Sequence, residues 1–213
     1  MTYYNDEKRE LFRNKVINGA RSYQKLTKKR FLILTDDNKY TEIEFHVEDF
    51  KHLTGLKSNL NDEQFFKNGI KGNIRKENIN ASQKYNFNTL KHKTNQIEKI
   101  DKLIYADISE SLFLINIKTD TADFNYGIKN NNKNICVAFV GEDNHARSLR
   151  KKNTLSEDEI MIIAIFEKPI IDGKPIELYE HLVYLKNIQK LKLNTYNFKE
   201  NLSKQLLNRL SIS

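Results

Sequence analysis

The stretches LFLINI (112–117), FNYGI (124–128), ICVAFV (135–140) and IMIIAIF (160–166) form four apolar runs separated by polar segments. Their length and their content of β-branched residues predict β-strands. Most of the segments between them are too short for a crossover helix, so an antiparallel sheet is expected. A further apolar run, 182–185, closes the predicted sheet.

The residues that precede this sheet are predicted to be mostly helical. A first helix is expected over residues 6–29, because apolar side chains recur there at intervals of three and four: Phe12, Val16, Ala20, Tyr23 and Leu26. Strands at 31–34 and 40–45 flank a polar turn and predict a β-hairpin, with Glu42, Glu44 and His46 on its wet face.

Two short helices are expected after the hairpin, at 47–56 and 62–70, the second with Asn61 or Asp62 as its N-cap. Residues 71–102 show little periodicity and are interpreted as a basic, Asn-rich connection, with a short helical stretch near 96–105. Phe198, Leu202, Leu206 and Leu210 recur at intervals of four and predict a last amphipathic helix.

Together these patterns predict an α+β fold, in which N-terminal helices pack on an antiparallel β-sheet and an extra helix follows at the C-terminus. A single domain is expected over residues 1–213. It divides into an N-terminal helix (1–24), a core (25–187) and a C-terminal helical extension (188–213).

The composition is basic, with 36 Lys and Arg residues against 28 Asp and Glu, a net charge of +8 and a pI of about 9.3. This balance favours a nucleic acid as partner, RNA somewhat more than DNA. No apolar run approaches the ~20 residues of a spanning helix, and no basic and apolar leader opens the chain, so a cytoplasmic protein without a membrane partner is expected. The single cysteine, Cys136, excludes an internal disulfide and a multi-cysteine zinc site.

No cofactor is expected, because none of the seven glycines falls into a nucleotide-phosphate loop. The run from His46 to His52 offers several metal-ligand types. A strand histidine followed by a helix-capping acid is the favoured interpretation of this run, so no metal site is predicted.

The five histidines are the natural proton carriers near neutral pH, and two of them, His52 and His181, lie in settings that bear on a site. His52 lies in FKHLTGL (50–56), two residues before Thr54, where Gly55 is expected to end a helix. From the residues alone, a histidine that interacts with the last helix carbonyls is the favoured interpretation. His181 shares a strand face with Tyr179 and Val183, and a buried core histidine is the default there.

A basic cluster spans residues 145–152 and includes Arg147, Ser148 and Arg150. Such clusters are usually solvated loops. If this one lies beside a groove, Arg147 can bind a phosphate in bidentate fashion and Ser148 can donate a hydrogen bond to it.

The order of these motifs resembles a family of phage-encoded nuclease-like domains, the fourth of those grouped with barnase, EndoU, the tRNase colicins and RelE. The resemblance covers roughly residues 25–187. It rests on the Phe-x-His-Leu-Thr-Gly segment (50–55), a Phe-Phe helix (65–66), a Lys/Ile-rich helix (100–104), Thr121-Ala122-Asp123-Phe124, an apolar strand and Arg147-Ser148-Leu149.

The resemblance implies a metal-independent endoribonuclease that cleaves RNA by attack of the 2′-hydroxyl on the adjacent phosphate. His52 would be the general acid or base, Thr54 its neighbour in the site, and Ser148 with Arg147 would hold the scissile phosphate. Arg150 and Lys91 are further candidates for substrate binding. The second proton-transfer group is left open between His181 and Lys91.

Two alternatives remain. The protein could be a catalytically inert nuclease fold that inhibits a host defence nuclease, in the manner of an anti-CRISPR protein, or a plain nucleic-acid-binding module. A working nuclease should place His52, Thr54, Arg147 and Ser148 in one groove, whereas an inhibitor need not.

Overall fold

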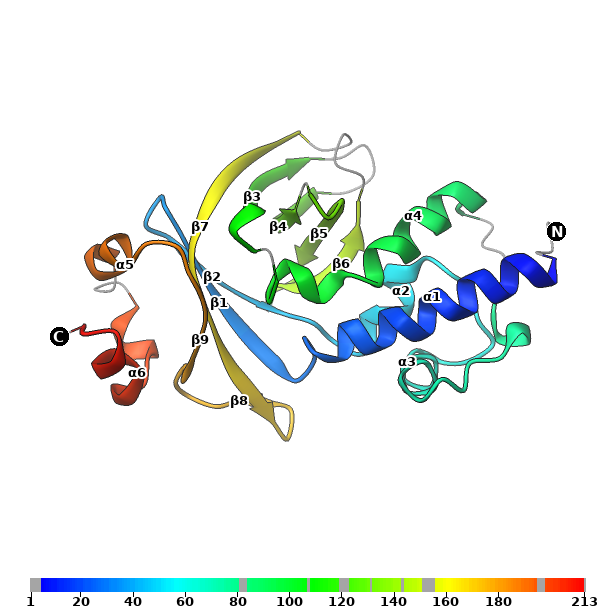
Figure 1. The fold of residues 1–213 in the computed structure, drawn as a ribbon, viewed down its shortest axis with the longest axis horizontal. Helices are drawn as coiled ribbons and strands as arrows, with labels where there is room; N and C mark the ends of the chain where they lie inside the picture. The colour runs from blue at the N-terminus through cyan, green and yellow to red at the C-terminus, as the bar shows by residue number, and fades with distance from the viewer. Residues whose placement is uncertain are drawn as a thin grey trace.

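Figure 1 shows the fold in a computed structural model, in which a curved β-sheet lies between two groups of helices. The structure describes residues 5–80, 84–106, 108–118, 123–130, 132–142, 144–150, 156–194 and 198–212. The helices of residues 6–97 lie at one end of the molecule and those of residues 188–209 at the other, so the two termini are far apart. The predicted α+β fold with a largely antiparallel sheet is confirmed.

The N-terminal helices are α1 (Asp6–Gln24), α2 (Asp49–Thr54), α3 (Asp62–Lys71) and α4 (Phe87–Ile97), with 3-10 turns η1 (Lys76–Asn78), η2 (Ile100–Leu103) and η3 (Ile108–Glu110). The Asn5 side chain caps α1 by accepting a hydrogen bond from the Lys8 amide at 3.1 Å. The predicted apolar face of α1 is buried. The helix ends at Gln24 and not near residue 29 as expected, because the chain turns there into the first strand.

The two predicted short helices are also confirmed. The Asn61 side chain accepts from the Gln64 amide at 2.8 Å and so caps α3, whose Phe65 and Phe66 are buried. Gly55 ends α2 in the left-handed region, with φ of 73°. Glycine adopts this conformation without the steric cost that a Cβ brings.

Helix α4 corrects the interpretation of residues 71–102 as an irregular connection. The Asn86 side chain caps it by accepting from the Thr89 amide at 2.9 Å. Its buried face carries Lys93, Thr94 and Gln96 beside apolar residues, so the usual apolar stripe is diluted. Each of these polar side chains is hydrogen-bonded inside the fold, which offsets the cost of its burial.

The strands are β1 (Lys29–Thr35), β2 (Tyr40–Glu44), β3 (Ser111–Lys118), β4 (Asp123–Asn130), β5 (Ile135–Val140), β6 (His145–Leu149), β7 (Ser156–Ile171), β8 (Lys174–Pro175) and β9 (His181–Leu185). In the described part of the chain, the pairings β1-β2-β6-β5-β4-β3-β7 continue back to β1, so these strands form a closed ring. The long β7 closes it by pairing with β3 and with β1. Thr121 and Ala122 of the family-like segment lie outside the described residues.

The ring has a weak seam between β2 and β6. Among the described residues these two strands run parallel and share the single register pair Glu44 and His145. The Asn144 side chain adds one hydrogen bond, from its Nδ2 to the Glu42 carbonyl at 3.1 Å. Every other neighbouring pair in the ring is antiparallel and has four or more register pairs.

The prediction that Glu42, Glu44 and His46 form a solvent-exposed face of the hairpin is partly wrong. Glu44 is buried. Its carboxylate accepts from the Arg30 guanidinium at 2.5 Å and lies 2.9 Å from the His46 ring, and these partners offset the cost of burying the charge. Burial alone raises the pKa of Glu44, but the hydrogen bonds to His46 and Arg30 outweigh burial and lower it. Glu44 is therefore a buried, paired carboxylate at the seam.

Strand β6 corrects the interpretation of residues 145–149 as part of a solvated loop. Ser148 pairs with Ala138 and Ala146 with Phe139, so Arg147 is an extra residue opposite two consecutive residues of β5. This is a β-bulge, which changes the direction in which the extra side chain points. Residues 151 and 152, the end of the basic cluster, lie outside the described residues.

The C-terminal region also differs from the single helix that was expected. It contains α5 (Ile188–Asn194), the turn η6 (Lys199–Asn201) and α6 (Lys204–Arg209), which begins at the N-cap Ser203. The four apolar residues at intervals of four are all buried, against Leu32, Ile163 and Phe166 on the outside of the ring. In the described part of the chain, no helix is long and apolar enough to span a membrane.

Inward and outward side chains alternate along the ring, as they do along any strand. Phe31, Phe113 and Phe139 point inward and join the N-terminal helices in one large apolar cluster. Outward residues of β3, β4 and β5, including Phe124 and Ala138, form a separate small cluster. This division decides which of the predicted site residues can meet.

Candidate functional site

A groove of about 520 Å³ lies where α2 approaches the bulge of β6. It is lined by Glu48, Asp49, Lys51, His52, Gly55, Leu56, Lys57, Ser58, Asp62, Lys84, Tyr85 and Arg147. Two of the candidates from the sequence, His52 and Arg147, therefore share one groove although 94 residues lie between them in the chain.

Arg147 reaches the groove because of the β-bulge. Its Nη1 donates to Oδ1 of Asp49 at 2.9 Å, and about half of its side chain (46%) remains exposed. Asp49 is buried beneath it, with a side chain 6% exposed. The guanidinium is thus held at the groove by one carboxylate oxygen and still presents N–H donors to an incoming anion.

His52 lies one helical turn after Asp49, so the two side chains share a face of α2. Among the described residues its ring has no hydrogen-bond partner, unlike the helix-capping histidine that was favoured from the residues alone. Partial burial of the ring, followed by the charges of Arg147 and Lys93, lowers the pKa of His52 below its ordinary value of 6.5. The imidazole is therefore neutral at neutral pH and able to accept a proton.

Lys93 of α4 is a functional candidate that no sequence pattern indicates. It is buried beneath the groove, and its Nζ donates to the Leu149 carbonyl at 2.9 Å. Burial, followed by the charges of Arg150 and Lys84, lowers the pKa of Lys93 to about 8. Lys93 and Lys84 lie 5.2 and 5.4 Å from the Tyr85 ring centroid, so two cations flank one groove-lining aromatic ring.

Thr54 lies under the groove and not in it. The residue is fully buried, its Oγ1 donates to the Lys51 carbonyl at 2.7 Å, and the same oxygen accepts from the Leu56 amide at 3.2 Å. Both hydrogen bonds close the turn that ends α2, which positions His52.

Ser148 and Arg150 are on the outward side of the sheet. Ser148 is directly opposite Ala138, and cross-strand partners share a face. Ala138 belongs to the outer cluster, as does Phe124, whose ring lies 4.9 Å from the Arg150 guanidinium carbon. Neither residue lines the groove, so the structure does not bring them to His52.

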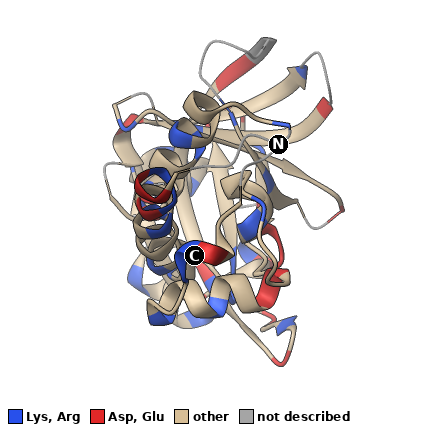
Figure 2. Ribbon diagram, turned by 90° about the vertical axis from the view of Figure 1, so that its right-hand side faces the viewer, with Lys and Arg blue, Asp and Glu red and all other residues tan. Residues whose placement is uncertain are grey.

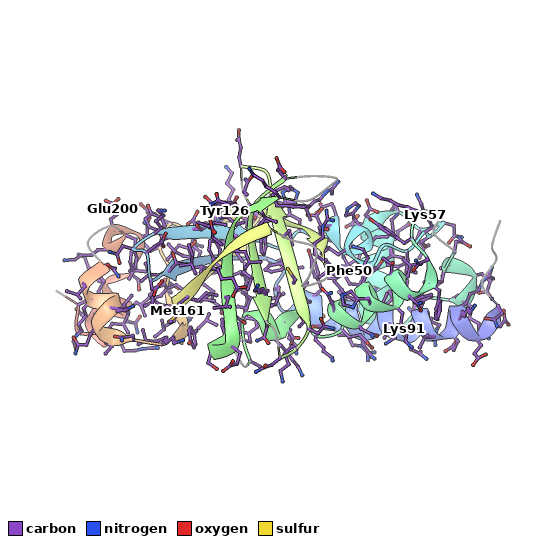
Figure 3. All side chains as sticks on the ribbon, turned by 90° about the horizontal axis from the view of Figure 1, so that it is seen from above. Phe50, Lys57, Lys91, Tyr126, Met161 and Glu200 are labelled. Atoms are coloured by element: carbon purple, nitrogen blue, oxygen red, sulfur yellow. The ribbon has the colours of Figure 1, made fainter. Side chains whose placement is uncertain are left out.

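His181 and Lys91 also lie away from the groove. His181 is on β9, opposite Glu167 of β7, and it is exposed, which corrects the expectation of a buried core histidine. Figure 1 shows β9 well separated from α2. Lys91 is exposed on α4. In Figure 3, Lys91 and the groove residue Lys57 lie on opposite edges of the part of the molecule that holds the N-terminal helices.

Seen from the end that holds the N-terminal helices, the positively charged residues are not confined to one face of the molecule. Figure 2 shows Lys and Arg on several elements in this view, with Asp and Glu among them. The binding of an anion depends on the charges that line the groove. Four cations, Arg147, Lys84, Lys57 and Lys51, and three carboxylates line it. One of these, Asp62, is already paired with Lys51 at 2.7 Å.

One group in the described residues has the ligand types of a metal site. His46, Asp49 and His145 each offer a ligand atom, and these atoms lie within 4.8 Å of one another. The sequence run from His46 to His52 contains two of the three, but His145 comes from β6 and only the fold brings it close.

Comparison with known proteins places this architecture in a class of nuclease-like proteins associated with phages. Residues 15–205 match the model of the family described as phage-Barnase-EndoU-ColicinE5/D-RelE like nuclease 4. The chain belongs to this family, and the match extends beyond residues 25–187 on both sides. No curated protein and no solved structure matches the chain significantly.

Proposed function

We propose that this protein is a metal-independent endoribonuclease, in which His52 is the general base and Arg147 binds the scissile phosphate. The observation that carries the proposal is that these two side chains line the same groove, one from α2 and the other from the bulge of β6. Membership of a nuclease family supports nuclease chemistry in general.

The proposed reaction begins when the neutral imidazole of His52 takes the proton of an RNA 2′-hydroxyl. The resulting oxygen attacks the adjacent phosphorus, a 2′,3′-cyclic phosphate forms, and the bond to the 5′-oxygen breaks. Arg147 stabilises the negative charge that develops on the phosphate oxygens. The lowered pKa of His52 supports this role, because a base must be unprotonated when it acts.

The remaining groove residues fit a single RNA strand. Lys84 on the groove wall and the buried Lys93 add positive charge beside the Tyr85 ring, which suits the phosphates of an RNA strand. The leaving 5′-oxygen takes a proton from a groove-lining donor, either Lys84 Nζ or the Tyr85 hydroxyl. His181 and Lys91 do not line the groove, so the proposal gives them no proton-transfer role.

The test is cleavage of total RNA by the purified protein in EDTA, with analysis of the new ends. The proposal expects cleavage with 2′,3′-cyclic phosphate ends, a loss of at least about 100-fold in His52→Ala and a comparable loss in Arg147→Gln. Arg209→Gln, an exposed arginine on α6, is the matched control. Circular dichroism confirms that each variant is folded. Cleavage by His52→Ala at the wild-type rate would refute the assignment.

The inert alternative is favoured by a different observation. Of the four residues that the resemblance assigns to the site, Thr54 has its hydroxyl committed to the backbone and Ser148 is on the outward side of the sheet. An inhibitor of a host defence nuclease, or a plain nucleic-acid-binding module, requires neither residue in the groove. RNA that stays intact with folded wild-type protein, but is bound in a salt-dependent manner, would support this alternative.

A further inference from the structure

The residues of the cluster His46, Asp49 and His145 come from both sides of the weak seam in the ring. His46 and Asp49 follow β2, and His145 is the first residue of β6. The His46 and His145 rings are stacked, with centroids 5.0 Å apart and planes inclined by 17°. In the described residues only one register pair joins the two strands at this point.

The separation of two of the donor atoms is unsuited to a hydrogen bond. Nε2 of His145 lies 3.7 Å from Oδ2 of Asp49, beyond ordinary hydrogen-bond length. Donor atoms on one tetrahedral zinc ion stand roughly 3.3 Å apart, given Zn–N and Zn–O bonds of about 2.0–2.2 Å. The other oxygen of Asp49 is occupied by Arg147, so Oδ2 is the one that can face an ion.

A second carboxylate orients His46. Oε2 of Glu44 lies 2.9 Å from Nε2 of His46, and Glu44 is itself buried and fixed by Arg30. A carboxylate that accepts from one nitrogen of a neutral imidazole fixes the tautomer in which the other nitrogen carries the lone pair. This is the usual arrangement behind a metal-bound histidine.

We infer that His46, Asp49 and His145 form a binding site for a divalent transition-metal ion of the zinc class, which joins β2 to β6. Two imidazoles and one carboxylate suit zinc and its neighbours better than magnesium or calcium, which prefer oxygen ligands alone. The ion would link both sides of the seam and brace the closure of the ring. The ion itself takes no part in the proposed cleavage, although Asp49 also holds Arg147 at the groove, so the inference goes beyond that function and does not depend on it.

The test is titration of the metal-free protein with zinc by calorimetry, together with the visible spectrum of the cobalt(II)-substituted protein. We expect one zinc ion per chain, the absorption typical of tetrahedral cobalt with nitrogen and oxygen ligands, and a higher Tm with zinc than with EDTA. His145→Gln and His46→Asn should each weaken zinc binding at least tenfold. Glu44→Gln should weaken it by about 10- to 100-fold.

The control is His181→Gln, which removes an exposed histidine on β9, outside the cluster. It should bind zinc like the wild type. Wild-type protein that binds no zinc, or that binds it no more tightly than folded His145→Gln, would overturn the inference. Neither result depends on whether the protein cleaves RNA, so failure here is separate from failure of the proposed function.

Discussion

Nη1 of Arg147 donates a hydrogen bond to Oδ1 of Asp49 at 2.9 Å, and this contact joins the bulge of β6 to the first turn of α2. Because His52 is one turn further along α2, the contact also sets where the phosphate-binding cation stands relative to the base. Asp49 is the more buried partner, so it depends most on the pair.

Replacing Asp49 with Asn should therefore destabilise the protein by about 1–3 kcal/mol, since the amide oxygen can still accept from Arg147 but the hydrogen bond loses the charge of the carboxylate. Urea unfolding at pH 7 measures the change. Glu63→Gln is the matched control, because it breaks an exposed pair with Lys67 on α3 and should cost no more than about 0.5 kcal/mol. Equal effects in the two variants would show that the Asp49 contact is a surface pair.

The pH dependence of cleavage should follow His52. Burial of the ring and the charges of Arg147 and Lys93 hold the pKa of His52 below 6.5, so protonation costs more in the folded protein than in the unfolded chain. Activity should persist as the pH falls to 6.5 and decline only below it. Histidine NMR titration measures the pKa directly.

Arg147→Gln should raise the pKa of His52, because it removes a neighbouring positive charge. Arg209→Gln on α6 should leave it unchanged. A His52 pKa above 6.5 in the wild type, or one that does not respond to Arg147→Gln, would contradict the geometry described here.

Thr54 should affect stability and not chemistry. Thr54→Val removes both hydrogen bonds that close the end of α2, and we expect a loss of about 1–3 kcal/mol. Thr54→Ser keeps the hydroxyl and should lose less. If catalysis per folded molecule falls by orders of magnitude in Thr54→Val while His52 keeps its pKa, the hydroxyl acts in the reaction after all.

Lys93 should make the protein more stable as the pH rises from about 8 toward 10.5. The pKa of Lys93 is about 8 in the fold against an ordinary 10.5, so between these values the unfolded chain binds a proton that the folded protein does not. Lys93→Met should abolish this rise in the free energy of unfolding. Lys91→Met, an exposed lysine on the same helix, should keep it, and identical pH profiles for the two variants would refute the shift.

The sequence predicted helices and strands best where apolar residues recur with a single clear spacing. The stripe of α1 and the runs of β3, β4, β5 and β9 predicted elements that the structure confirms. Helix α4 was missed because its buried face carries Lys93, Thr94 and Gln96, whose partners are known only once the chain is folded. At the C-terminus the period of four predicted which residues are buried, but Ser203 is extended and divides the region.

The site was partly predictable for the same kind of reason. His52 and Gly55 belong to one short segment, and their local arrangement follows from the end of a helix. One extra residue in β6 shifts the register of this strand against β5. This shift is the reason why Arg147 reaches the groove and Ser148 does not. Periodicity cannot reveal a bulge whose cause lies in the partner strand.

The most direct test of the central claim uses a DNA oligonucleotide that contains a single ribonucleotide, incubated with the protein in EDTA. If His52 activates a 2′-hydroxyl, the wild type cuts only after the ribonucleotide and leaves a 2′,3′-cyclic phosphate, and His52→Ala leaves the strand intact. Cleavage at deoxynucleotides, or at the ribonucleotide with equal rate in folded His52→Ala, would contradict the account.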